Sequence, residues 1–234
     1  MDNELKKIPF AELAARVEKN NLLVIFPEKR LVLSNGVLNG GLFYGQSLLN
    51  HGASEKPEDY DKIIADPVEY LACLAQSLGL EDSVATMTAV EMKDLVVEQE
   101  RYADGSLCLL ITGGVTNAVR AGDPTQWKES EGSFEKIGTI NIILLTDLSL
   151  KGRALVDCVQ VITEGKGAAL QELGVRSTVA NNLATGTGTD TVMVVSGLGK
   201  PITYGGTHSL FGEILGRLTI RGVKRALTKT RRMR

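Results

Sequence analysis

Short apolar runs that end in glycine-, threonine- and asparagine-rich loops constrain the fold of this chain most. In the clearest case, Thr185-Gly-Thr-Gly-Thr-Asp190 leads into the apolar run Val192–Val195. Glycine adds no side chain to a core, but it permits close backbone approach and leaves N–H groups for a ligand oxygen. We therefore predict a ligand-binding or catalytic loop beside a buried strand. A tight turn with capping hydroxyls is the alternative.

The remaining segments mix strand-like and helix-like patterns. Apolar runs and turn residues predict strands at 22–26 and 30–33 (a hairpin that turns at 27–29), 95–100 and 107–112 (joined by 103–105), 138–147, 192–195, and 202–204 as a partner of 192–195. We expect helices at 1–20, 42–49, 66–78 and 151–173, and a final helix from about 208 that ends in a basic segment, 218–234.

Strands that are both paired as hairpins and crossed by helices predict a mixed α/β or α+β fold. No low-complexity linker divides the chain, so we expect one layered domain over residues 1–234, with a central mixed sheet flanked by helices. The glycine-rich loops stand at strand ends, and we expect them to converge on one cleft.

Composition excludes several classes of protein. Only 5% of the 234 residues are aromatic, which argues against stacking on single-stranded nucleic acid. The net charge is −2, although residues 217–234 hold eight basic side chains and no acidic one. We interpret them as a solvated helix end and expect no nucleic-acid partner. The apolar runs are too short to span a membrane, and three scattered cysteines suit the cytoplasm.

Few ionisable groups accompany these loops. His208 follows Gly205-Gly206-Thr207 at a helix start and is a candidate general base or acid, with Asp190 as the carboxylate that orients it. An exposed helix-start histidine and a turn-capping aspartate are the alternatives. Thr187 is a candidate nucleophile, and Glu164 is a further candidate catalytic residue. Two glycines near Glu164, at 165 and 167, indicate close approach by a ligand or by another helix.

An ordered set of motifs lies within a resemblance that runs from about residue 22 to residue 217. The segments are Ser34–Gly41, Asn50-His51, Met87–Val90, Thr112–Asp123, Gly138–Asn141, Ala168–Gly174, Thr185–Asp190 and Tyr204–His208. Together they resemble the adenosylcobinamide amidohydrolase family of cobinamide salvage. The resemblance implies hydrolysis of the amide between the corrin propionate and aminopropanol, which yields adenosylcobyric acid and 1-amino-2-propanol. A non-catalytic corrinoid- or nucleotide-binding protein is the alternative.

A corrinoid substrate carries many peripheral amides around a large apolar ring, so its site needs amide, hydroxyl and basic groups. The expected substrate-binding residues are Asn39, Asn50, Thr112, Asn117, Arg120, Asn141, Lys166 and Thr185. Backbone N–H groups of Gly113-Gly114 or of 186–188 would stabilise the oxyanion, with Thr187 or water as the nucleophile. We predict no cofactor and no metal ligands, while metal dependence and a homo-oligomer stay open.

Overall fold

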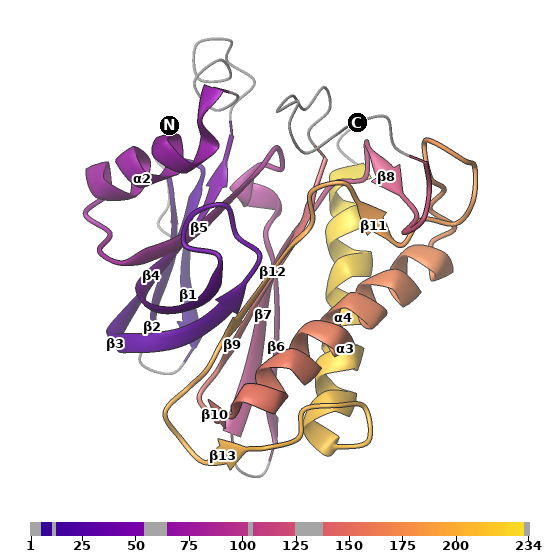
Figure 1. The fold of residues 1–234 in the computed structure, drawn as a ribbon. Coiled ribbons are helices and arrows are strands. Elements are labelled where there is room, and N and C mark those ends of the chain that lie inside the picture. The colour runs from indigo at the N-terminus through magenta and orange to yellow at the C-terminus, as the bar shows by residue number, and fades with distance from the viewer. Residues whose placement is uncertain (1–5, 11–12, 54–64, 103–104, 125–137, 232–234) are drawn as a thin grey trace.

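The computed structural model describes residues 6–10, 13–53, 65–102, 105–124 and 138–231, in which runs of strands are interrupted by helices (Figure 1). The strands are β1 (Lys6–Phe10), β2 (Leu13–Glu18), β3 (Asn21–Ser34), β4 (Gly41–Gly52), β5 (Ser83–Thr88), β6 (Val96–Tyr102), β7 (Gly105–Gly113), β8 (Ala118–Val119), β9 (Ile140–Thr146), β10 (Ser149–Leu150), β11 (Gly186–Thr187), β12 (Thr191–Val195) and β13 (Pro201–Ile202). The helices are α2 (Pro67–Ser77), η1 (Met92–Asp94, a 3₁₀ turn), α3 (Gly152–Glu172) and α4 (Leu210–Arg231).

One long strand, β3, joins two parts of a nine-stranded sheet. On one side β4 pairs antiparallel with both halves of β3, and on the other side β2 pairs antiparallel with its first half and β12 with its last residues. From β12 the order continues through β9 and β7 to β6, while β4 pairs with β5 on the other side. The β12–β9 and β4–β5 pairs are parallel and their neighbours are antiparallel, so the sheet is mixed as predicted.

Successive residues of the central strands enter different cores, which gives the domain four layers. Ile142 and Leu144 of β9 face the core beneath α3 and α4, whereas Ile143 and Leu145 face a core shared with β3, β4 and β5. A third core, between β4, β5 and α2, contains Leu49. The order is therefore α2, sheet, sheet, and α3 with α4, and this confirms the expected single mixed domain with its central sheet flanked by helices.

The helices have the local signals that the sequence predicted. Asp66 caps α2 by accepting bonds from the N–H groups of Val68 and Glu69, and Gly79 beyond its end has a φ of +69°. Gly174 follows α3 with a φ of +62°. Since a positive φ suits glycine, both helices stop where expected. None of the described helices is long and apolar enough to cross a membrane.

Several local predictions were wrong. The expected N-terminal helix at 1–20 contains β1 and β2 instead, and 42–49 belongs to β4. Leu48 and Leu49 of β4 are both buried, on opposite faces, so the apolar run of a strand covered on both sides resembled a helix. Residues 27–29 form no hairpin turn but an irregularity within β3, where the register shifts between Ile25 and Arg30. Finally, β13 pairs with β10, not with β12.

Candidate active site

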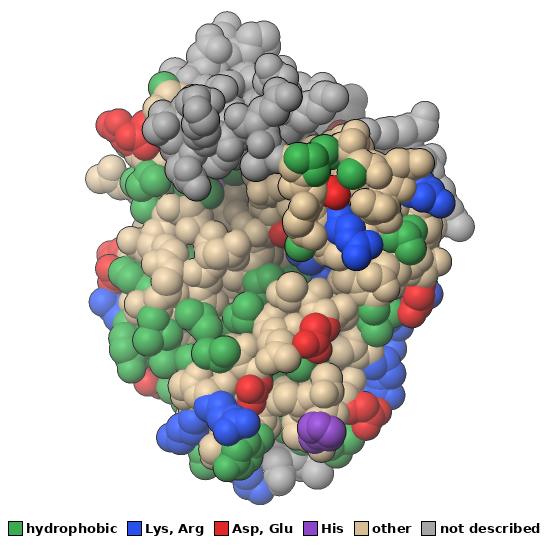
Figure 2. Space-filling model, turned by 45° about the vertical axis from the view of Figure 1, so that its right-hand side comes forward, with side chains coloured by type: hydrophobic (Ala, Val, Ile, Leu, Met, Phe, Trp, Pro, Cys, Tyr) green, Lys and Arg blue, Asp and Glu red, His purple; other side chains and the backbone are tan. Residues whose placement is uncertain are grey.

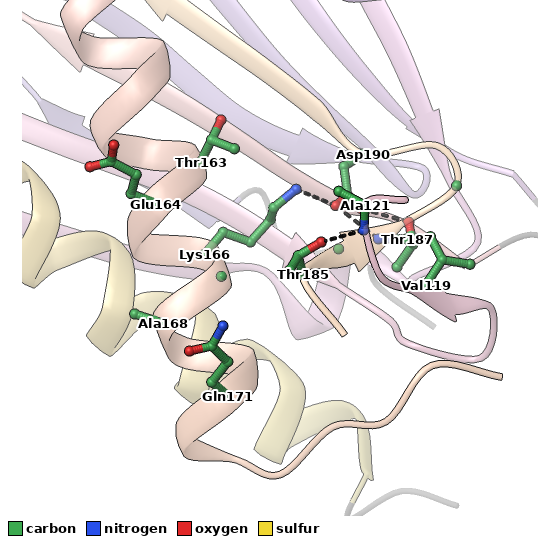
Figure 3. A pocket seen from close by; sticks show the side chains of 13 residues that line it. Val119, Ala121, Thr163, Glu164, Lys166, Ala168, Gln171, Thr185, Thr187 and Asp190 are labelled. Atoms are coloured by element: carbon green, nitrogen blue, oxygen red, sulfur yellow. Dashed lines mark hydrogen bonds and ion pairs between the residues drawn. The ribbon is translucent and has the colours of Figure 1, made fainter. Parts of the chain in front are cut away.

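A pocket of about 650 Å³ opens between α3 and the turn that leads into β12 (Figure 3). Its walls come from the second half of α3, from the edge of β8 and from the threonine–glycine loop. The residues that line it are Val119, Ala121, Thr163, Glu164, Lys166, Gly167, Ala168, Gln171, Thr185, Gly186, Thr187, Gly188 and Asp190. The loop singled out in the sequence thus borders a ligand-sized cavity.

Asp190 is the centre of the polar groups in this pocket. One carboxylate oxygen, Oδ2, pairs with the ammonium of Lys166 and accepts the backbone N–H of Thr187 at 3.0 Å. The other oxygen, Oδ1, accepts the hydroxyl of Thr187 at 2.6 Å and the N–H of Ile140 at 2.9 Å. The side chains of Lys166 and Asp190 are each only 9% exposed. Burial of these two charges is tolerated because they pair with each other and the carboxylate has further donors.

Glycine positions explain how the loop and helix reach this geometry. A Cβ on Gly186 would lie 2.4 Å from Oδ2 of Asp190 and 2.9 Å from the Lys166 ammonium, so only glycine leaves room for the ion pair. In α3, a Cβ on Gly165 would lie 3.1 Å from the side chain of Thr219 in α4, whereas Gly167 borders the pocket. Of the two explanations for these glycines, helix crossing therefore applies to Gly165, while Gly167 lines the pocket and ligand access there stays a prediction.

Five of the residues predicted from the sequence meet in this pocket: Thr187, Asp190, Lys166, Thr185 and Glu164. Thr185 accepts the N–H of Ala121 at 2.9 Å and so ties the loop to the segment after β8. Glu164 is exposed at the rim, where Gln160 donates a 2.9 Å hydrogen bond to it.

His208 lies elsewhere, and the expectation that Asp190 orients it does not hold in this structure. It is exposed in the segment before α4, where the N–H of nearby Gly205 donates to Asp157 at 2.9 Å. Asp157 and Lys166 stand nine positions apart on α3, or about 13 Å along the helix axis. The contacts of the Asp190 carboxylate are Lys166, Thr187 and Ile140.

Three predicted substrate residues lie between the sheets instead of in the pocket. Asn50, Thr112 and Asn141 are at most 1% exposed. The Asn141 amide donates to Asn50 Oδ1 at 3.0 Å and to the Met87 carbonyl at 2.9 Å, and the Asn50 amide donates to Thr112 at 3.2 Å. Because they bond to one another and are buried, they hold the two sheets together in this structure and do not contact a ligand in the pocket.

The other predicted binding residues are scattered around the loops. Asn39 is exposed in the turn before β4 with a φ of +53°, and its amide donates to the Ser83 carbonyl at 2.9 Å. Asn117 precedes β8, and Arg120 is exposed between Val119 and Ala121, which line the pocket. The glycine-rich loops thus converge on one cleft only in part.

At one of the two expected oxyanion sites, Gly113-Gly114, the backbone already takes part in bonds within the protein. The N–H of Gly114 donates to the Thr139 carbonyl at 3.0 Å, and Gly113 belongs to β7, where it pairs with Ile140. Gly186 and Gly188 line the pocket, so the 186–188 alternative stays a prediction, although the N–H of Thr187 between them already donates to Asp190.

Sequence reasoning missed two residues that brace Asp190. The Asn35 side chain donates to the Asp190 carbonyl at 2.8 Å and accepts the Val192 N–H at 2.8 Å. The Thr139 hydroxyl donates to the Thr189 carbonyl at 2.7 Å. Two signals were available: each polar residue adjoins an apolar run, and each lies within a motif segment, Ser34–Gly41 or Gly138–Asn141. Among the described residues, no group of three or more histidine, cysteine, aspartate or glutamate side chains could hold a metal ion.

A family model described as adenosylcobinamide amidohydrolase (CbiZ) matches residues 7–234. The chain belongs to the adenosylcobinamide amidohydrolase family. This match includes the basic C-terminal segment. The resemblance therefore extends beyond residue 217, where we had ended it. An adenosylcobinamide amidohydrolase of Methanosarcina mazei is 29% identical over 81% of this chain and 86% of its own length. An uncharacterized protein of Methanocaldococcus jannaschii is 33% identical over 95% of this chain and 92% of its own.

Two solved structures have related shapes and cover 96% of this member of the adenosylcobinamide amidohydrolase family. The PH0078 protein of Pyrococcus horikoshii OT3 has a TM-score of 0.45 at 13% identity, with 80% of its chain covered. The L-aminopeptidase D-Ala-esterase/amidase of Ochrobactrum anthropi has a TM-score of 0.39 at 12% identity, also with 80% covered.

Proposed function

We propose that this protein hydrolyses the amide that joins aminopropanol to the corrin propionate of adenosylcobinamide. The products are adenosylcobyric acid and 1-amino-2-propanol, and the role is corrinoid salvage in the cytoplasm. The observation that carries the proposal is the contact of Lys166, Asp190 and Thr187 at the pocket of a chain that belongs to this family. These three side chains provide a cation, a carboxylate base and a hydroxyl.

Asp190 is suited to move a proton because the Thr187 hydroxyl already donates to its carboxylate at 2.6 Å. In the proposed reaction, Asp190 takes the proton of Thr187, whose oxygen attacks the amide carbon and forms a tetrahedral oxyanion. Asp190 then passes the proton to the leaving nitrogen as the C–N bond breaks. Water releases the acid by the same steps in reverse and restores Thr187. In the alternative route, a water bound to Asp190 attacks directly.

Lys166 is suited to stabilise the oxyanion. Its ammonium has three N–H donors, one of which serves Asp190, and the side chain borders the pocket. The backbone of 186–188 adjoins the same space. A fixed cation in a largely buried site stabilises developing negative charge more than it would in water.

Incubation with adenosylcobinamide, followed by chromatography and mass spectrometry, tests the function. We expect both products from the native protein, with or without EDTA, and a loss of at least ~100-fold in kcat for Asp190→Asn. His208→Ala is the matched control and should stay within a few-fold, because His208 lies outside the pocket. Binding of adenosylcobinamide without any product would instead identify a corrinoid-binding protein. Loss of activity in EDTA would assign the chemistry to a metal.

Two substitutions of Thr187 distinguish the nucleophiles. Thr187→Ser keeps a hydroxyl and should retain activity on either route. Thr187→Val should abolish turnover if threonine attacks, whereas activity that survives this change would identify water as the nucleophile.

A further inference from the structure

Two large apolar side chains are exposed at the start of β4. Leu42 and Tyr44, at the start of β4, are 63% and 64% exposed. They pair across the ladder with Leu33 and Leu31 of β3. Directly opposite residues of antiparallel strands point to the same face of a sheet, so the four side chains form one apolar surface. We refer to Leu31, Leu33, Leu42 and Tyr44 as the apolar platform.

The platform lies on the face of the sheet that α3 and α4 cover elsewhere. Leu31 and Leu33 pack partly against the core beneath these helices, and Leu33 pairs with Val194 of β12, over which α3 lies. Leu42 and Tyr44 extend the same face one strand further, where they are exposed to solvent. Figure 2 shows hydrophobic side chains gathered on the left of this face, on the side where Figure 1 places β3 and β4.

Asn35 links the strand that carries the platform to the loop of Asp190. β3 ends at Ser34, and the next residue, Asn35, bonds to the backbone of Asp190 and Val192 through its side chain. Leu33 is therefore two positions from a residue whose side chain holds the backbone of Asp190. Leu33 lies opposite Val194, four residues from Asp190, so at about 3.3 Å per residue the platform begins roughly 13 Å from Asp190 and leads away from it along β3.

We infer that the apolar platform binds the flat, apolar macrocycle of the corrinoid while one peripheral amide enters the pocket. This inference rests on the proposed function. A pocket of about 650 Å³ is the size that suits a drug-sized molecule, so most of a corrinoid must lie outside it. Exposed leucine and tyrosine side chains provide the apolar contact area that a large ring needs. The platform is thus a specificity-determining surface for macrocyclic substrates.

The test compares the binding and turnover of platform variants. In equilibrium dialysis of adenosylcobinamide, followed by its visible absorbance, the double variant Leu42→Ser/Tyr44→Ser should bind at least about tenfold more weakly. Its kcat should stay within about twofold, because the groups around Asp190 are untouched. Leu42→Met/Tyr44→Phe keeps the apolar surface and should restore affinity. Val68→Ser, an exposed apolar residue on α2, is the control and should leave affinity unchanged.

The outcomes separate the platform from the reaction. Normal hydrolysis with unchanged affinity in the double variant would overturn the platform and leave the proposed function standing. Weaker binding by the variant, with no hydrolysis by the native protein, would support the platform and overturn the function. A native dimer that the double variant dissociates in sedimentation velocity, with affinity unchanged, would overturn the inference and assign the surface to a second copy of the chain.

Discussion

At the scale of single residues, burial decides how the three cysteines behave. Cys108 and Cys158 are buried in the cores on the two faces of the central sheet, and burial raises the pKa of each thiol from 9.0 to about 12. Cys73 is exposed on α2. A thiol reacts through its thiolate. The two buried thiols are inert near neutral pH because reagents cannot reach them and because they stay protonated.

A thiol-labelling experiment checks this difference. At pH 8 the native protein should react quickly at Cys73 alone, and the unfolded protein at all three cysteines, as counted by mass spectrometry. Because folding raises the pKa of two thiols, the unfolded chain releases their protons first, and their contribution to stability is lost as the pH rises from about 9 toward 12. Rapid labelling of Cys108 or Cys158 at pH 8 would contradict the assignment.

At the scale of elements, α4 is anchored to the sheet by charge as well as by its apolar face. Glu98 of β6 is only 3% exposed and pairs with Arg221 at 2.6 Å and with Arg225. Both arginines belong to the basic segment, which we interpreted from the sequence as a solvated helix end. The basic side chains of α4 therefore have a structural partner, and the helix covers β6 and β7.

Removal of both arginines should destabilise the domain. Arg221→Met/Arg225→Met leaves the Glu98 carboxylate buried without them, and we expect a loss of about 2–4 kcal/mol, below the range for fully buried pairs because both arginines are about half exposed. Urea unfolding measures this loss. Lys224→Met, which breaks an exposed pair with Glu172, is the control and should cost less than about 1 kcal/mol. Equal losses in the two variants would rule out the anchoring role.

At the scale of the whole molecule, one end of the space between the two sheets is polar. Asn50 from β4 and Asn141 from β9 bond across this space, and Thr86 of β5 bonds to Thr191 of β12 at 2.9 Å. Thr139 connects this layer to the loop of Asp190 through its bonds to Asn141 and to the Thr189 carbonyl. The packing of the two sheets and the position of the Asp190 loop are therefore linked.

A double-mutant cycle measures the strength of the connection. Asn50→Ala and Asn141→Ala should each cost about 1–3 kcal/mol, because each leaves a buried partner unsatisfied. The double variant should cost less than their sum, with a coupling of about 0.5–3 kcal/mol in urea unfolding. Asn50→Ala combined with Asn39→Ala, at the opposite end of β4, should be additive. Additivity in the first pair would show that the two sheets are not coupled through these amides.

The sequence predictions succeeded where the signal lay within a few neighbouring residues. The helix signals of α2 and α3 and the paired runs of β6 and β7 lie within a few residues, and these elements were confirmed. The segment of β4 was misread because an apolar run covered on both faces has no period of its own. At the site, the loop by itself placed Thr187 beside Asp190, whereas the pairing of Asp190 with Lys166 from another element was not predicted, since we expected His208 as the partner of Asp190.

What the sequence determined by itself is local chemistry: a glycine-rich loop with hydroxyls and a carboxylate before a buried strand, and helices with clear ends. Only the tertiary structure decided the partners of these groups. Lys166 pairs with Asp190 because α3 lies against β12, whereas His208 is carried to another part of the fold by the start of α4. Asn50 and Asn141 became an inter-sheet layer for the same reason. Contacts between residues far apart in the chain depend on how faces pack, and no local pattern records that packing.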